Sequence, residues 1–309
     1  MIAYIVNSLC RQKWDRMAYE NGTPFTFNSE YMARRFVGLQ NEETTAYIAK
    51  HLSSMCQETL GCVLDYPVMK GQSVENKAIV MLYSKTDEGA NFDENEPAAF
   101  NVAFSWELSD GTPCIHYGLF IVTPSHQRKG IQGPLGFLNL YMLLRNIEAS
   151  TVWMTDLGRS PSGSRHFINF MSEVYPRPPS SKAEEKAALS DDEESQYEAQ
   201  LRVAREFHAR FQKDAGMSAN SVLDGMVIKG SNLEGGATAL VDVNGSTRSR
   251  SKAYNDWIDK LCPSPADELL MVGQFLPGQF VYRQVFQKNF PWLVPSATTT
   301  SDSKEQASS

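Results

Sequence analysis

The most constraining feature of the sequence is a glycine-bearing loop between a predicted strand and a predicted helix. Residues 114–122 (CIHYGLFIV) form an apolar run typical of a strand, and residues 134–146 (PLGFLNLYMLLRN) form an apolar run that begins with proline. The loop at 123–133 therefore leads to a helix N-terminus. Unpaired backbone N–H groups and the positive end of the helix dipole suit a diphosphate at such a place.

The elements around this loop predict a mixed α/β fold. Residues 98–107 form a second apolar run, and the Asp110-Gly111 turn that follows it is typical of a β-hairpin. The patterns also predict strands at 77–83 and 151–155, an exposed acidic loop at 87–97, and helices at 42–60 and 162–174. We therefore expect a central twisted, mostly antiparallel sheet flanked by helices.

The character of the sequence changes after residue 175. A cluster of prolines and serines (PRPPSS, 176–181) precedes a charged amphipathic stretch at 190–212 that is typical of a helix. Further strands are predicted within 226–229, 238–243 and 269–286, with a basic loop at 247–252. The predicted division is a core at 1–175, an insertion with a charged helix and loops at 176–268, C-terminal strands that complete the core at 269–294, and a disordered tail at 295–309.

Composition excludes some classes of function. The 309-residue chain has a formal net charge of −7, which argues against nucleic acid as a partner. Its five cysteines lack the short paired spacings of a zinc or redox site, so we expect no metal and a reducing compartment. No segment approaches the ~20 apolar residues of a membrane helix. The short apolar start at the N-terminus lacks the basic segment and the small-residue cleavage site of a secretory signal, so the predicted location is cytoplasmic. The oligomeric state is open.

The segment from His116 to Leu135 resembles motif A of the GNAT superfamily of N-acetyltransferases. In that motif a strand and a proline-containing turn lead to Gln/Arg-x-x-Gly-x-Gly/Ala and a helix. Pro124, Gln127 and Gly130 fall in register with it, whereas Gln132 stands where glycine or alanine is usual and Gly133 comes one position late. The resemblance implies that acetyl-coenzyme A is the cosubstrate and that its diphosphate is bound by Gln127, Arg128, Lys129, Gly130, Ile131, Gln132 and Gly133.

The resemblance also implies roles for the strand before the loop. The fourth and fifth strands of GNAT enzymes separate, and the pantetheine lies in the gap. By position, the Phe120 N–H would polarise the thioester carbonyl and Val122 would bind the pantetheine arm, with Ile121 between them. His116 lies early on the fourth strand, where several relatives carry a catalytic glutamate, and it is our candidate base. Simple alternation puts His116 on the same face as Gly118, Phe120 and Val122.

The family's frequent acid, a tyrosine on the helix after the fifth strand, falls on Phe170, which cannot donate a proton. Tyr141, Tyr175 and water stay open as substitutes. Asp156, Ser160 and Ser162 lie where contacts to the acceptor or the pantetheine are made. Arg248, Arg250 and Lys252 are candidates for the coenzyme's 3′-phosphate.

The predicted activity is direct transfer of an acetyl or other acyl group to an amine of a small molecule or peptide within a ternary complex. Two alternatives stay open: a catalytically degenerate acyl-coenzyme A binding protein, suggested by Gln132 and Phe170, and a protein-interaction module built on the charged helix. Each candidate residue also has a structural explanation. The loop is then an ordinary connection, His116 a strand residue satisfied by a neighbour, and Cys114 a small apolar filler rather than a nucleophile.

Overall fold

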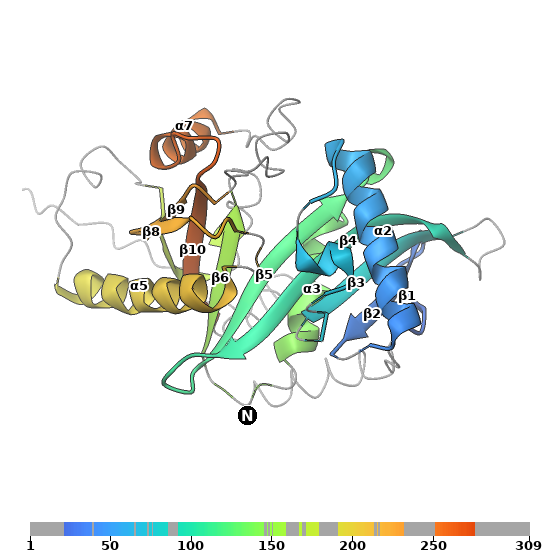
Figure 1. The fold of residues 1–309 in the computed structure, drawn as a ribbon, viewed down its shortest axis with the longest axis horizontal. Coiled ribbons are helices and arrows are strands. Elements are labelled where there is room, and N and C mark those ends of the chain that lie inside the picture. The colour runs from blue at the N-terminus through green and yellow to red at the C-terminus, as the bar shows by residue number, and fades with distance from the viewer. Residues whose placement is uncertain are drawn as a thin grey trace, which may run out of the picture.

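In the part of the chain that the computed structural model describes, the backbone forms one sheet of ten strands with helices on both faces (Figure 1). The described residues are 22–275, without 39, 65, 73, 76, 86–91, 145–146, 148, 150, 159–166, 169–170, 179–190, 213–214, 216 and 232–250. The strands are β1 (Phe25–Thr26), β2 (Tyr31–Val37), β3 (Lys77–Lys85), β4 (Phe92–Glu107), β5 (Pro113–Val122), β6 (Val152–Gly158), β7 (Ser172–Tyr175), β8 (Val222–Asp224), β9 (Val227–Lys229) and β10 (Glu268–Phe275). The helices are α2 (Glu42–Leu60), α3 (Gln132–Leu144), α5 (Asp191–Phe211) and α7 (Lys252–Leu261), with 3-10 turns η1 (Pro67–Lys70) and η2 (Pro124–His126).

The strand order is β1-β2-β3-β4-β5-β6-β10-β9-β8, and β7 also pairs with β10. The strands pair antiparallel except for β5 and β6, which are parallel. A parallel pair needs a crossover connection, and α3 supplies it. The predicted mixed α/β class, with a mostly antiparallel sheet flanked by helices, is confirmed.

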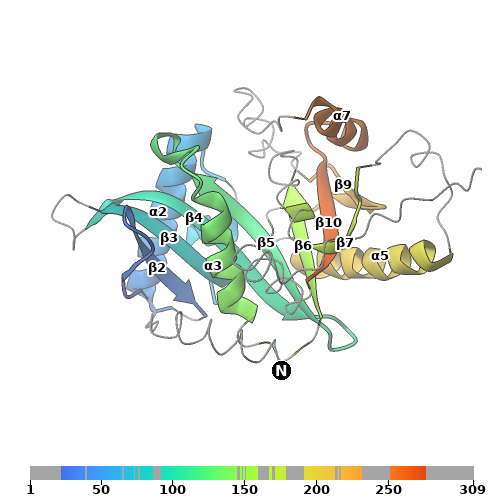
Figure 2. The same cartoon turned by 180° about the vertical axis from the view of Figure 1, so that it is seen from behind.

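Helices α2 and α5 cover one face of the sheet, and α3 covers the other (Figures 1 and 2). Ile79 and Val80 of β3 mark the two faces, because successive strand residues point in opposite directions. Ile79 packs with Leu52 of α2, whereas Val80 packs with Leu138 of α3. On the first face, Phe207 of α5 lies in the apolar cluster beside that of α2. We call these two sides the α2/α5 face and the α3 face.

Local sequence signals account for α2. The Asn41 side chain accepts a hydrogen bond from the Thr44 N–H and caps the helix, and Glu42 and Glu43 lie in its first turn. Gly61 ends it at a φ of 74°, a conformation that glycine adopts without a steric penalty. The prediction of a helix at 42–60 is confirmed. No helix in the described residues is long and apolar enough to span a membrane.

Two predicted boundaries are wrong because pairing with distant strands overrides the local pattern. Strand β4 begins at Phe92, inside the predicted acidic loop, and Phe92 is in register with Lys85 of β3. Residues 172–175 form a strand rather than the end of a helix, since they pair with the edge of β10. The strand predicted at 238–243, the continuation beyond residue 275 and the tail at 295–309 lie outside the described residues.

The charged helix α5 is part of the main core. Its residues Leu201, Ala204 and Phe207 share an apolar cluster with Phe104 of β4 and Val272 of β10. The predicted insertion at 176–268 stays a prediction. Its helix α5 nevertheless packs against β4, which precedes that segment in the chain, and β10, which spans its end.

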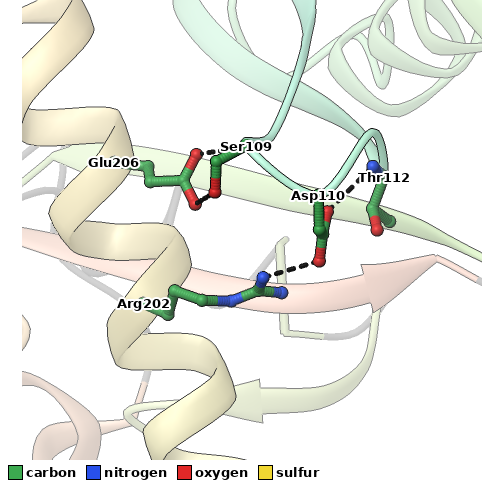
Figure 3. A network of polar contacts seen from close by, with 5 residues as sticks. All are labelled: Ser109, Asp110, Thr112, Arg202 and Glu206. Atoms are coloured by element: carbon green, nitrogen blue, oxygen red, sulfur yellow. Dashed lines mark hydrogen bonds and ion pairs between the residues drawn. The ribbon is translucent and has the colours of Figure 1, made fainter.

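Polar contacts fix the outer side of α5 to the turn between β4 and β5 (Figure 3). Ser109 donates from its backbone N–H and its hydroxyl to the Glu206 carboxylate, each at 2.8 Å. Arg202 donates to the Asp110 carboxylate at 2.6 Å, and the Thr112 N–H donates to the same carboxylate at 2.9 Å. Hydrogen bonds from Thr112, and then from Arg202, lower the pKa of Asp110 to about 2. The turn therefore acts as a clamp that positions α5 over the sheet.

Candidate functional site

The two halves of the sheet separate between β5 and β6. These strands are in register from Cys114 opposite Trp153 to Tyr117 opposite Asp156. Beyond that pair β5 continues to Val122 alongside β4, whereas β6 continues to Gly158 alongside β10. Figure 1 shows β5 leaning away from β6 in this part. In the residues that the structure describes, the second half of β5, residues 118–122, therefore has a strand on one side only.

A β-bulge in β5 coincides with this separation. Asn101 of β4 is opposite Phe120 and Ala103 is opposite Tyr117, so β5 contains one extra residue between these pairs. Gly118 lies in the bulge, where an added Cβ would come within 2.8 Å of the Val102 carbonyl oxygen. A larger residue at position 118 would therefore displace the backbone of β4.

The bulge reverses the alternation of side chains, so the predicted common face is wrong. His116 stacks on Phe207 of α5, with 4.6 Å between ring centroids, and thus lies on the α2/α5 face. Phe120 and Val122 pack in the apolar cluster that contains Leu135 of α3, on the opposite face. Side chains alternate between the two faces of a strand. His116 and Phe120 would therefore share a face only if β5 had no extra residue between them.

The backbone of β5 directs two N–H groups toward the open side. The Thr123 N–H donates to the Ala98 carbonyl of β4 at 3.0 Å. Because hydrogen bonding alternates along an antiparallel pair, Ile121 also faces β4, whereas the N–H groups of Phe120 and Val122 point away from it. These are the two residues that the resemblance assigned to the thioester and the pantetheine arm.

The loop after β5 contains two residues in the left-handed conformation. Arg128 and Gly130 have φ angles of 65° and 71°, in the left-handed region. Left-handed residues within a turn gather successive N–H groups into a concave nest that suits anions. Residues 127–130 are exposed, and Gly130 has nothing within 4 Å of an added Cβ. The Gln127 N–H donates to the Pro124 carbonyl at 3.4 Å.

Helix α3 starts at Gln132, two residues before the predicted start. The Leu135 N–H donates to the Ile131 carbonyl at 3.0 Å, so the N–H groups of Gln132 and Gly133 lie in the first turn, before this first intrahelical bond. The Gln132 side chain is exposed and is not buried within the loop. Ile131 is 4% exposed and packs in the α3-face core, so only its backbone can serve a ligand.

His116 is buried, with an exposed fraction of 5%. Its Nδ1 lies 3.0 Å from the Thr155 hydroxyl, and its ring packs against Phe104 and Phe207. Burial, and then the positive charge of Lys77, lower the pKa of His116 from 6.5 to about 3. The imidazole is therefore neutral at physiological pH. In this state it is a weak base. Its edge faces Gly118, since an added Cβ there would lie 3.5 Å from Nε2.

Asp156 lies at the point where β5 and β6 separate. The sequence predicted for it only a contact to the acceptor or the pantetheine. It is half-buried, and burial, with the charge of Glu268 as the second cause, raises the pKa of its carboxyl from 3.8 to about 7. Burial and the charge of Asp156 raise the pKa of Tyr117, its partner in register. The signal in the sequence is a carboxylate two residues after the apolar run Val152-Trp153-Met154.

The remaining candidates divide into structural residues and residues outside the described chain. Cys114 is fully buried, and burial raises the pKa of its thiol, so it fills the core rather than acting as a nucleophile. Tyr175 packs against Tyr197 of α5 at 4.6 Å between ring centroids. Lys252 begins α7 and forms an ion pair with Asp256 at 2.6 Å. Structure is not described for Ser160, Ser162, Phe170, Arg248, Arg250 and the Tyr141 side chain.

No protein-family model matches the sequence, and no curated protein sequence matches it. Several solved structures match part of the chain at low identity. A chain of the NatC complex bound to Gag peptide and CoA is 14% identical, with a TM-score of 0.33, over 50% of this chain and 92% of that chain. A ribosomal-protein-alanine N-acetyltransferase from Brucella melitensis biovar Abortus 2308 is 13% identical, with a TM-score of 0.29, over 52% of this chain and 93% of that chain.

A putative acetyltransferase of the GNAT family from Desulfovibrio desulfuricans is 14% identical, with a TM-score of 0.28, over 45% of this chain and 82% of that chain. Because these scores are below 0.5, the likenesses carry no conclusion about this chain. Its own element order, with a hairpin, a loop, a helix and a parallel strand that diverges, is the arrangement that the resemblance to the GNAT superfamily predicted.

Proposed function

We propose that this protein transfers an acyl group from a coenzyme A thioester to an amine within a ternary complex. The observation that carries the proposal is the separation of β5 from β6 after Tyr117, next to a loop with two left-handed residues that leads into α3. An extended arm fits along the unpaired edge of β5, while a diphosphate fits the N–H groups at the helix start. The acceptor then approaches the thioester from the α2/α5 face.

The coenzyme is bound mainly by backbone groups. The Phe120 N–H polarises the thioester carbonyl, and the Val122 N–H binds the pantetheine arm, with Ile121 anchored toward β4 between them. The diphosphate takes hydrogen bonds from the N–H groups of the loop and first helical turn, which comprise Arg128, Lys129, Gly130, Ile131, Gln132 and Gly133. Gln127, whose own N–H donates to the Pro124 carbonyl at 3.4 Å, begins this loop. The side chains of Arg128 and Lys129 add positive charge. Acetyl-coenzyme A is the proposed cosubstrate.

His116 stays our proposal for the group that receives the amine proton, through its Nε2 edge beside Gly118. Its burial and lowered pKa favour the alternative of a protein that binds the coenzyme without turnover. A base of this strength works only if the bound acceptor or its water changes the surroundings of the ring. Thiol release from acetyl-coenzyme A over a panel of amines and peptides separates the two functions, because the binding protein gives none.

Calorimetric titration with acetyl-coenzyme A tests the binding step. A matched pair of variants separates backbone from side chain at the helix start. Gln132→Pro removes one N–H donor at a position where proline suits a helix, whereas Gln132→Ala keeps the N–H and removes the side chain. We expect the proline variant to bind about 10-fold or more weaker, since a hydrogen bond to a charged group contributes roughly 1.5–3 kcal/mol. The alanine variant should bind like the wild type. Absence of any binding by the wild type overturns the proposed function.

A further inference from the structure

We propose that Asp156 is the acid that protonates the departing coenzyme thiolate. This inference rests on the proposed function and adds a catalytic residue to it. Phe170 falls at the position of the family's usual acid and cannot fill the role, so the reaction needs another proton donor near the thioester sulfur.

The place of Asp156 in the sheet is the first reason. It forms, with Tyr117, the last register pair before β5 and β6 separate. Any group that occupies the angle between the strands therefore lies next to the Tyr117–Asp156 pair. On the other side Asp156 is in register with Met271 of β10, so two neighbouring strands fix its position.

The face of the sheet is the second reason. Met154, two residues before Asp156 on β6, packs in the apolar cluster that includes Leu140 of α3. Alternation along β6 therefore directs Asp156 to the α3 face, on the same side as Tyr117. The proposed diphosphate site lies at the start of α3, so the coenzyme reaches the angle between the strands from this face. Its sulfur then leaves on the side of Asp156, whereas the acceptor lies on the side of His116.

The chemistry of the carboxyl is the third reason. Burial and the charge of Glu268 keep a large fraction of Asp156 protonated near neutral pH. The cysteine thiol has a pKa of about 8.5, so proton transfer from this acid to a thiolate at least as basic is favourable. In the step, the amine nitrogen bonds to the carbonyl carbon, and the carbon–sulfur bond then breaks. The sulfur takes the Asp156 proton. The amine proton passes to His116 and from there to solvent, and the Asp156 carboxylate regains a proton from solvent.

Close packing holds Tyr117, the register partner of Asp156, in place. The Tyr117 side chain lies over Gly136 of α3, where an added Cβ would come within 1.6 Å of the phenol oxygen. A residue larger than glycine at 136 would therefore displace the Tyr117 side chain. Among the described residues, the charge of Glu268 from β10 acts on the Asp156 carboxyl, and the charge of Asp156 acts in turn on Tyr117 from β5.

The test compares Asp156→Asn with wild type in acetyl-coenzyme A binding and in kcat. We expect the dissociation constant to stay within about threefold and kcat to fall by roughly 10²-fold or more, the usual contribution of general acid catalysis. The wild-type kcat should also decline above about pH 7 as the acid loses its proton, and this decline should be absent in Asp156→Asn. Asp110→Asn, a change at an exposed carboxylate in the β4–β5 turn, is the matched control and should leave kcat and the pH profile unchanged.

The outcomes separate the two proposals. A wild type that binds no acetyl-coenzyme A removes the proposed function itself. A wild type that turns over, with Asp156→Asn equal to it in kcat and pH profile, removes only the role of Asp156. If Asp156→Asn does not fold, Asp156→Glu replaces it. The glutamate variant should keep turnover with a shifted alkaline limb, and an unshifted limb contradicts the assignment.

Discussion

Two adjacent register pairs of β5 and β6 place ionisable groups on opposite faces of the same sheet. His116 and Thr155 form one pair, under Phe207 of α5, and Tyr117 and Asp156 form the next, on the α3 face. The pKa of His116 is lowered to about 3, whereas the pKa of Asp156 is raised to about 7. Burial is the largest cause in both cases, and it favours the uncharged form of each group.

The comparison teaches that one physical effect prepares the two faces for different chemistry. An uncharged imidazole has one N–H donor and one nitrogen that can accept a proton, whereas an uncharged carboxyl group is an acid with a proton to donate. The neighbouring charges reinforce burial, since Lys77 acts on His116 and Glu268 acts on Asp156. The α2/α5 face of the strand pair therefore holds a neutral base, and the α3 face holds a protonated acid.

Removal of the aromatic cover of the α2/α5 face should give the largest effect. Phe207 is fully buried, so Phe207→Ala should cost roughly 3–5 kcal/mol of unfolding free energy, measured by urea denaturation. It should also raise the pKa of His116 toward 6.5 by admitting water, as an NMR titration would measure. Arg205→Ala on the exposed side of α5 is the control and should change stability by less than about 0.5 kcal/mol. An unchanged His116 pKa would show that burial under Phe207 does not keep the imidazole neutral.

The pH dependence of stability should have opposite signs for the two groups. The folded pKa of His116 is below its unfolded value of 6.5, so its contribution to stability is lost as pH falls from about 6.5 to 3. The folded pKa of Asp156 is above its unfolded value of 3.8, so its contribution is lost as pH rises from about 4 to 7. One pKa unit corresponds to about 1.4 kcal/mol, so each change is on the order of a few kcal/mol.

Urea denaturation between pH 4 and 8 measures these slopes. His116→Gln should lose less stability than wild type on acidification, and Asp156→Asn should lose less on raising the pH toward 7. Parallel curves for the wild type and both variants would show that the two groups do not titrate differently on folding.

A smaller effect should follow from removal of the hydroxyl that orients the imidazole. Thr155→Val leaves Nδ1 of His116 without the Thr155 partner in a buried setting, at a cost of roughly 1–3 kcal/mol in thermal or urea unfolding. Thr155→Ser keeps the hydroxyl and should recover most of that loss. Because Thr155 faces away from Asp156, the alkaline limb of kcat should keep its position. A shift of that limb would mean that the two faces are coupled.

The smallest effect should come from the exposed clamp on α5. Arg202→Ala removes the ion pair with Asp110, whose partners are both substantially exposed, and should cost at most about 1 kcal/mol. The loss should shrink in high salt. A loss as large as that of Phe207→Ala would show that the clamp, rather than the apolar core, holds α5 over His116.

The sequence predicted the main elements well where their signals are local. Asn41 and Gly61 bound α2, the Asp110-Gly111 turn joins β4 to β5, and the loop at 123–133 leads into α3. The extent of β4 and the strand at 172–175 were not predicted, because their hydrogen-bonding partners are remote in the chain. For the site, the resemblance named Phe120 and Val122, but alternation put His116 on the wrong face relative to them.

By itself, the sequence determined which stretches extend, which coil, and where backbone N–H groups gather at a helix start, because propensity, turn chemistry and apolar periodicity act over a few residues. Only the tertiary structure decided that an extra residue in β5 reverses its faces and that α5 closes over His116. It also decided that Asp156 lies where two strands separate. Strand register and desolvation depend on residues distant in the chain, and so the chemistry of each buried group was set by packing.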